Sequence, residues 1–257
     1  MRTPLIAGNW KMHKTLAEAR ELVTALRAGF EKRKGIQGVE VLICPPAHLL
    51  FPMAKALAGS PIKLGAQNAH YEDHGAFTGE VAVPMLKETG CTHVIIGHSE
   101  RRQQVGEAGE LLAKKVRAVA RHGLTAIYCV GETLKERELN ETEQVVTRQL
   151  REVLGNDVPM ERVVVAYEPV WAIGTGKTAK PDQAQAVHAL IRRELDAVYG
   201  EGMADGVRIL YGGSVKPDNA ADLLGQPDLD GALVGGACLV AADFLAIISA
   251  GIARVGR

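Results

Sequence analysis

Short apolar runs recur along the whole chain. Each run is rich in β-branched residues, is too short for a helix, and is bounded by glycine, proline or polar residues. Near-continuous apolar runs of this kind are typical of parallel strands that are buried on both faces. We therefore expect strands over residues 5–7, 39–44, 62–66, 93–96, 124–130, 163–167, 207–211 and 232–234.

Segments with a helical period lie between these runs. Residues 15–28, 107–121 and 182–199 each place their apolar side chains on one stripe, as amphipathic helices do. Alternation of strands and helices over 257 residues predicts an α/β fold, a (β/α)8 TIM barrel that forms a single domain over residues 1–257. A doubly wound open sheet with an extra strand or two also satisfies the pattern. No Ser/Gly-rich tract or charge block marks a linker between domains.

The charge balance and the cysteines narrow the class of protein. Lys and Arg number 30 and Asp and Glu number 30, so the formal net charge is zero, and we expect neither nucleic acid nor a membrane surface as a partner. No run approaches the roughly 20 apolar residues of a membrane span, and the start has no signal-peptide pattern. The four cysteines are widely spaced, which favours reduced thiols over a disulfide framework or a metal site. These features predict a cytoplasmic protein without a bound metal.

In either α/β architecture, the residues that carry chemistry follow the carboxyl ends of the strands. Polar or glycine-rich segments stand there at residues 8–11, 97–102, 168–178, 211–214 and 234–236. The most specific is 168–178, where Glu-Pro-Val-Trp leads into Gly-Thr-Gly. Together these segments resemble the triosephosphate isomerase family, and the resemblance covers nearly the whole chain.

The resemblance implies an isomerase that interconverts dihydroxyacetone phosphate and D-glyceraldehyde 3-phosphate through an enediol or enediolate. This reaction belongs to glycolysis and gluconeogenesis, and the family uses no cofactor or metal. A protein of another class has the same fold, namely a catalytically silent barrel that binds a sugar phosphate or a protein partner. The joint presence of Lys11, His98 and Glu168 argues against that alternative.

Glu168 and His98 are the candidates for proton transfer. Pro169 restricts Glu168 to an extended backbone, which aims its carboxylate at a fixed place, as a general base requires. His98 stands just before Ser99, a good N-cap residue, so we expect its imidazole to be neutral at the positive end of a helix. The resemblance implies that Glu168 removes a carbon-bound proton and that His98 moves protons between the two oxygens of the enediolate.

Asn9 and Lys11 are the candidates for binding the substrate oxygens. The resemblance assigns them this role, and it makes Lys11 a catalytic cation that is already in place when negative charge develops. Glu100 is a candidate to hold Lys11 through an ion pair. A carboxylate that caps the helix after the fourth strand satisfies the sequence nearly as well.

Four residues match the positions with which the family binds phosphate: Gly174, Ser214, Gly235 and Gly236. The last three follow the seventh and eighth strands, where barrels commonly hold a phosphate through backbone N–H groups.

Residues 174–178, Gly-Thr-Gly-Lys-Thr, also look like part of a nucleotide-binding loop. A P-loop requires glycine at the position of Trp171, so we interpret residues 170–178 as a lid over the substrate instead. By resemblance, the Tyr211 hydroxyl helps to hold the closed lid.

The connection after the third strand predicts a homodimer. Residues 68–79 form a loop of about a dozen residues, whereas βα loops commonly have 2–6. The loop carries Tyr71 and Phe77, which a solvated loop would leave exposed. In the family this loop inserts into the partner subunit, which would place Thr78 near the partner's Asn9, Lys11 and Glu100. The alternative is that the loop folds back on its own barrel.

Overall fold

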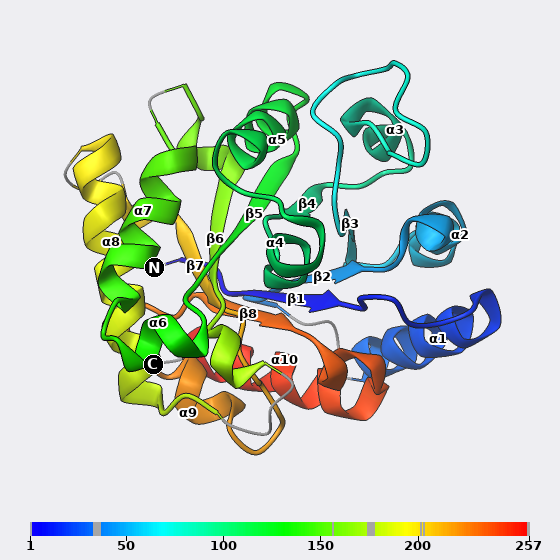
Figure 1. Cartoon of the computed structure of the whole chain (residues 1–257). Coiled ribbons are helices and arrows are strands. Elements are labelled where there is room, and N and C mark those ends of the chain that lie inside the picture. Colours follow the sequence, from blue (N-terminus) through cyan, green and yellow to red (C-terminus); the bar gives the residue numbers. More distant parts are fainter. Residues whose placement is uncertain are drawn as a thin grey trace.

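The computed structural model describes residues 2–32, 37–155, 157–173, 178–200, 202 and 204–255. Eight parallel strands close into a barrel in which each strand pairs with its neighbours in sequence and the first pairs with the last (Figure 1). The strands are β1 (Leu5–Asn9), β2 (Glu40–Cys44), β3 (Lys63–Ala66), β4 (His93–Ile96), β5 (Thr125–Val130), β6 (Val163–Tyr167), β7 (Arg208–Tyr211) and β8 (Gly231–Val234). All the expected strands are therefore confirmed, and the open-sheet alternative is wrong.

The strands are apolar on both faces because they pack in two directions. Alternate strand residues, such as Leu5 and Ala7 of β1 and Ile127 and Cys129 of β5, meet inside the barrel in one buried cluster. The residues between them, such as Ile6 and Val41, pack outward against the helices in a second, larger cluster. This double burial explains why the sequence has continuous apolar runs instead of an alternating pattern.

Helices cover the outside of the barrel (Figure 1). The three helices expected from the sequence are present as α1 (Leu16–Lys32), α5 (Gly109–Arg121) and α8 (Pro181–Tyr199). The others are α2 (Leu50–Leu57), α3 (Val83–Glu88), α4 (Ser99–Val105), α6 (Leu134–Glu138), α7 (Thr142–Val153), α9 (Ala220–Leu224) and α10 (Ala241–Val255), and the 3-10 turns are η1 (Ala47–Leu49), η2 (Met160–Arg162), η3 (Val170–Ala172), η4 (Ala204–Gly206) and η5 (Gly236–Leu239).

One expected helix begins later than its apolar stripe suggests. We expected a helix from residue 107, but α5 begins at Gly109. Glu107 instead lies buried before the helix, where its Oε1 accepts from Lys115 Nζ at 2.6 Å and from Arg101 Nη2 at 2.7 Å. The carboxylate of Glu107 therefore links Arg101 of α4 to Lys115 of α5.

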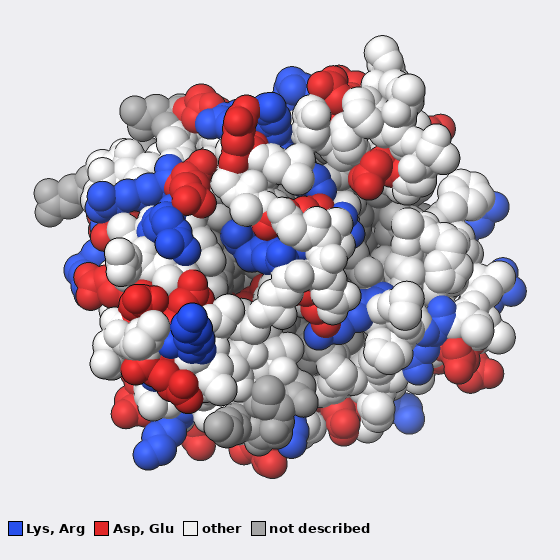
Figure 2. All heavy atoms as spheres, viewed as in Figure 1, with Lys and Arg blue, Asp and Glu red and all other residues white. Residues whose placement is uncertain are grey.

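The surface agrees with the balanced charge of the chain. Figure 2 shows that acidic and basic side chains are mixed over the face in view, without a broad region of one sign. Among the helices that the structure describes, none is long and apolar enough to cross a membrane. The loop between β3 and α3 stands out from the body of the barrel (Figure 1).

Candidate active site

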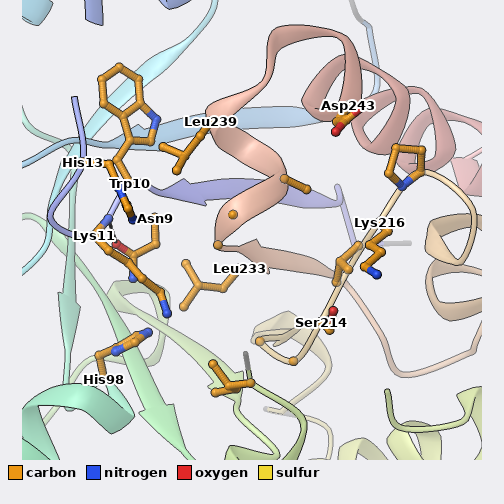
Figure 3. A pocket seen from close by; sticks show the side chains of 18 of the residues that line it. Asn9, Trp10, Lys11, His13, His98, Ser214, Lys216, Leu233, Leu239 and Asp243 are labelled. Carbon is orange, nitrogen blue, oxygen red and sulfur yellow. Dashed lines mark hydrogen bonds between the residues drawn. The ribbon is translucent and has the colours of Figure 1, made fainter. Parts of the chain in front are cut away.

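A cavity of about 720 Å³ opens at the carboxyl end of the barrel. Figure 3 shows that Lys11 and His98 extend toward each other on one side of the cavity, while Ser214 lies across from them. Asn9, Gly235 and Gly236 also line the cavity. The structure thus brings together predicted residues from four strand ends. The first and the last of these residues, Asn9 and Gly236, lie more than 200 positions apart in the sequence.

Lys11 is held by its backbone as well as by its side chain. Its φ of 51° lies in the left-handed region, which is costly for a residue with a side chain. The Lys11 N–H donates to Asn9 Oδ1 at 3.0 Å, and the Lys11 carbonyl accepts from Gln67 Nε2 at 2.8 Å. Its Nζ lies 2.6 Å from Glu100 Oε1, so the expected ion pair is present. These contacts fix the ammonium group beside His98.

His98 differs from expectation in how it meets α4. We expected Ser99 to be the N-cap, but Ser99 is the first helical residue and His98 itself is the cap, with its Nδ1 accepting from the Glu100 N–H at 3.3 Å. An Nδ1 that accepts a hydrogen bond carries a lone pair, so this contact assigns the ring proton to Nε2. That nitrogen faces Glu168 Oε1 at 2.9 Å. The tautomer is therefore set by the helix, and the proton points into the site.

Glu168 is almost fully buried and pairs with His98. Its Oε2 accepts from the Ser99 N–H at 2.9 Å, and its Oε1 lies 2.9 Å from His98 Nε2. Burial by itself would raise the pKa of Glu168, but His98 and the Ser99 N–H outweigh it and hold that pKa below its ordinary value. Burial would lower the pKa of His98, yet the Glu168 carboxylate outweighs it and raises that pKa. From the sequence we expected the helix N-terminus to keep His98 neutral. The contact with Glu168 acts in the opposite direction, so the helix N-terminus alone does not decide the charge of His98.

The carboxylate of Glu168 is turned away from the main cavity. Glu168 is not among the described residues that line the 720 Å³ cavity, but it lines a smaller cavity of about 140 Å³ with Ser99, Gly131 and Gln149. To reach a ligand between Lys11 and Ser214, the carboxylate has to leave Ser99 and His98. The backbone of Glu168 is fixed meanwhile, because its N–H donates to Val130 O at 2.7 Å.

The glycines beside the cavity leave space for close approach. A Cβ on Gly212 would lie 2.8 Å from Glu168 Cγ, and a Cβ on Gly213 would overlap the Tyr211 hydroxyl. Ser214, Gly235 and Gly236 all line the cavity, and Ser214 lies across it from His98. Gly174, the remaining predicted phosphate ligand, lies outside the described residues, as do its neighbours up to residue 177.

The predicted supporting residues occupy different environments. Tyr211 is fully buried, burial raises its pKa to about 12, and the Ala179 backbone N–H opposes that shift. Its hydroxyl therefore lies near the far end of the expected lid segment. Thr78 is exposed on the loop between β3 and α3. Phe77 of that loop is exposed, whereas Tyr71 is half-buried and packs against the core of its own barrel, as the alternative of a loop that folds back implies for this residue.

A buried carboxylate below the lid segment escaped the sequence reasoning. Glu132 is fully buried and accepts from the Tyr167 hydroxyl at 3.1 Å, from Trp171 Nε1 at 2.9 Å and from Arg137 Nη1 at 3.3 Å. It thereby links the segment after β5 to the start of the lid segment. The only signal in the sequence is an acidic residue two positions after a buried strand. Acidic residues are common at such positions in solvated turns, so the signal does not single out Glu132.

The site suits proton transfer on a small anionic ligand. A buried carboxylate touches an imidazole, and a lysine held by an ion pair lies beside them, so a base, an acid and a fixed cation share one site. Over the described part of the chain, no group of three or more His, Cys, Asp or Glu side chains could hold a metal ion.

Known proteins are similar to this chain over nearly its full length. The family model of triosephosphate isomerase matches residues 4–251. The triosephosphate isomerase of Roseiflexus sp. (strain RS-1) is 54% identical over 250 residues, covering 96% of this chain and 97% of the relative. That of Moorella thermoacetica is 55% identical over 251 residues, covering 97% and 99%.

A solved structure agrees in three dimensions as well. The crystal structure of triosephosphate isomerase from Bartonella henselae superposes with a TM-score of 0.88 at 44% identity, covering 96% of this chain and 98% of that one. A match of this extent to the family model, the relatives and the structure leads to one conclusion. This chain belongs to the triosephosphate isomerase family.

Proposed function

We propose that this chain interconverts dihydroxyacetone phosphate and D-glyceraldehyde 3-phosphate through an enediol or enediolate. The observation that carries the proposal is the contact of Glu168 Oε1 with His98 Nε2 at 2.9 Å, beside Lys11, which pairs with Glu100 and lines the large cavity. The relatives that bear the name triosephosphate isomerase support the same reaction. A catalytically silent barrel is not favoured, because binding alone has no use for a buried acid–base pair.

Glu168 is the proposed base. It takes a proton from the carbon next to the carbonyl; the electron pair of that C–H bond forms the C=C bond of the enediolate, and the π pair of the carbonyl moves onto its oxygen. In its contacts with His98 and the Ser99 N–H the carboxylate is held ionised, because these contacts lower its pKa. Once it has left them for the substrate, burial favours its protonated form and so favours uptake of the proton. The same group then returns the proton to the neighbouring carbon, so the overall reaction gains and loses no atoms.

His98 and Lys11 are the proposed partners of the enediolate oxygens. His98 presents its Nε2 proton to one oxygen and collects a proton from the other. Lys11 and Asn9 stabilise the negative charge, and the contacts that hold Lys11 mean that little reorganisation accompanies the reaction. Departure of Glu168 from His98 frees Nε2 for the substrate.

The phosphate is proposed to bind across the cavity from His98. Ser214, Gly235 and Gly236, which line the cavity, are the proposed ligands, together with Gly174, which lies outside the described residues. Glycine lets the backbone N–H groups approach a dianion closely without a side chain in the way. Closure of residues 170–178 would then exclude water from the enediolate.

A homodimer is proposed from a second cavity and an exposed methionine. Met12 is 94% exposed and Val105 is 60% exposed, and both line a cavity of about 370 Å³ together with Gln67 and Glu100. Apolar side chains at the rim of a cavity are typical of an interface. The proposed occupant is residues 68–79 of the partner subunit, which would bring the exposed Thr78 toward Lys11 and Glu100.

A cytoplasmic location is also proposed. Its support is that Cys44, Cys91, Cys129 and Cys238 are all free and buried, as thiols of a reducing compartment are.

A turnover assay tests the function directly. Purified protein is given either triose phosphate in the presence of EDTA and without nucleotide, and the other triose phosphate is measured in quenched samples through a separate coupled reaction. Turnover in both directions supports the proposal. Binding of 2-phosphoglycolate without any turnover would instead point to a silent sugar-phosphate-binding barrel.

A further inference from the structure

Gly131, directly after β5, supports the peptide that carries Glu168. A Cβ on Gly131 would overlap the Glu168 carbonyl oxygen and lie 2.6 Å from the carbonyl carbon. The backbone of Gly131 is therefore in direct contact with the backbone of Glu168, so the position of Gly131 limits the position of Glu168. A shift of Gly131 is transmitted to the Cα from which the Glu168 side chain extends.

Packing alone does not hold Gly131 in place. The small cavity of about 140 Å³ lies beside it, lined by Gly131, Glu168 and Val170. Backbone next to a cavity has room to move, because no side chain fills the space on that side. A restraint on Gly131 has to come from hydrogen bonds.

Gln149 supplies those hydrogen bonds from outside the barrel. Its Oε1 accepts from the Gly131 N–H at 2.8 Å, and its Nε2 donates to the Gly131 carbonyl at 3.2 Å. A primary amide can accept from and donate to one residue at the same time, which a hydroxyl or a carboxylate does less well. The side chain of α7 thus clamps both backbone groups of the residue under Glu168.

The clamp is itself anchored to two strands. The Tyr128 hydroxyl donates to the Gln149 backbone carbonyl at 2.6 Å and accepts from Arg102 Nη2 at 3.1 Å. Arg102 also donates to the carbonyls of Gly97 at 2.8 Å and Cys129 at 2.9 Å. Burial raises the pKa of Tyr128 to about 12, so its hydroxyl remains protonated and can donate.

We propose that Gln149 is a positioning residue for the isomerase reaction, which holds Gly131 so that the Glu168 carboxylate reaches the substrate carbon at the right distance. This inference rests on the proposed role of Glu168 as the base. The clamp matters most when the carboxylate has left Ser99 and His98, because Glu168 is then located through its backbone alone. Gln149 is absent from the described lining of the main cavity and is not expected to bind substrate.

The main test replaces Gln149 with methionine, which has a similar length and no hydrogen-bonding amide. Displacement of a reacting group by about 1 Å can lower a rate about a hundredfold, so we expect kcat of Gln149→Met to fall by about 10- to 100-fold. KM for the triose phosphates and the Kd and stoichiometry of 2-phosphoglycolate binding should stay within about threefold of the wild type. Gln144→Met, at an exposed position of the same helix, is the matched control and should retain full kcat.

Gln149→Glu adds a readout that a purely structural role would not move. A protonated carboxyl can both accept from and donate to Gly131, whereas the carboxylate can only accept and repels the Gly131 carbonyl. The kcat of Gln149→Glu relative to the wild type should therefore rise as the pH falls from about 8 to about 6, since burial favours the protonated form.

Three outcomes would overturn the positioning role. The first is a kcat of Gln149→Met within about threefold of the wild type. The second is a fall in kcat of Gln149→Met matched by an equal fall in the stoichiometry of 2-phosphoglycolate binding, which would mean that part of the protein is unfolded. The third is a kcat of Gln149→Glu relative to the wild type that does not change with pH. An absence of turnover in the wild type would count against the proposed function instead, so the two failures are distinguishable.

Discussion

Shortening Glu168 by one methylene tests the geometry of the proposed base. In Glu168→Asp the carboxylate withdraws by about 1.5 Å, the length of one carbon–carbon bond. The backbone cannot advance to compensate, because the Glu168 N–H is bonded to Val130 O at 2.7 Å and Gly131 lies in contact with its carbonyl. The whole displacement therefore falls on the reacting oxygen.

The expected loss follows from that displacement. A misplacement of about 1 Å costs about a hundredfold in rate, equivalent to about 2.7 kcal/mol in the barrier, and about 1.5 Å should cost at least that. The 2.9 Å contacts of the carboxylate with the Ser99 N–H and His98 Nε2 are lost as well, so the pKa of the carboxyl should rise, because burial is then opposed less. The proposed phosphate site includes Ser214, across the cavity from His98, so the affinity for a phosphate-bearing ligand should not change.

The assay is steady-state turnover in both directions, with the Kd of 2-phosphoglycolate measured by calorimetry. Glu161→Asp is a suitable control, because Glu161 is exposed near the start of β6, at the other end of the strand that precedes Glu168. We expect kcat to fall at least about a hundredfold in Glu168→Asp alone, with Kd within about threefold. A folded Glu168→Asp protein with the kcat of the wild type would refute the assignment of Glu168 as the base.

Three further predictions concern stability, assembly and the lid. His93 and His188 are buried, and burial lowers the pKa of each from about 6.5 to about 4. Between about pH 6.5 and pH 4 the unfolded chain therefore binds more protons than the folded chain. The free energy of unfolding should fall as the pH drops through that window, and denaturant titrations of His188→Gln should show a smaller fall; an unchanged pH dependence in that variant would contradict this cause. Thr78→Arg should place an unpaired cation in the proposed interface, giving monomers by light scattering and a much lower kcat, and a fully active wild-type monomer at micromolar concentration would refute the proposed dimer. Bound 2-phosphoglycolate should slow amide exchange over residues 170–178, and equal exchange with and without the ligand would show that this segment does not act as a lid.

Much of the fold is predictable because the pattern of burial is simple. Each strand is buried on both faces, so each leaves a continuous apolar run that a solvated segment would not carry. The ion pair of Lys11 with Glu100 was one of two alternatives that the sequence left open for Glu100, and the structure shows it. The ends of the helices were less predictable. Nothing in the sequence shows that Glu107 lies before α5, held by two ion pairs, and not in the first turn of that helix.

The contacts around the base illustrate what a sequence pattern leaves out. Ser99 is the better N-cap by residue type, but His98 takes that position because its Nδ1 reaches the Glu100 N–H and the Ser99 N–H is engaged by Glu168. The partner that displaces the local preference lies 69 positions away in the chain. Local propensity describes a residue beside its neighbours, whereas the closed barrel brings β4 and β6 to one site through the strand between them.

The same reasoning explains why Gln149 is invisible in the sequence. A glutamine on an amphipathic helix is typical of a solvated face, and the spacing along α7 gives no reason to treat it otherwise. Its function arises only because Gly131, 18 positions earlier, has no side chain and can lie against the Glu168 backbone while both of its own backbone groups point at α7. The glycine that permits close approach to the base also creates the need for a restraint. In a barrel whose reacting groups come from separate strands, the residues that hold those strand ends in place are therefore to be sought on the outer helices as well as at the rim.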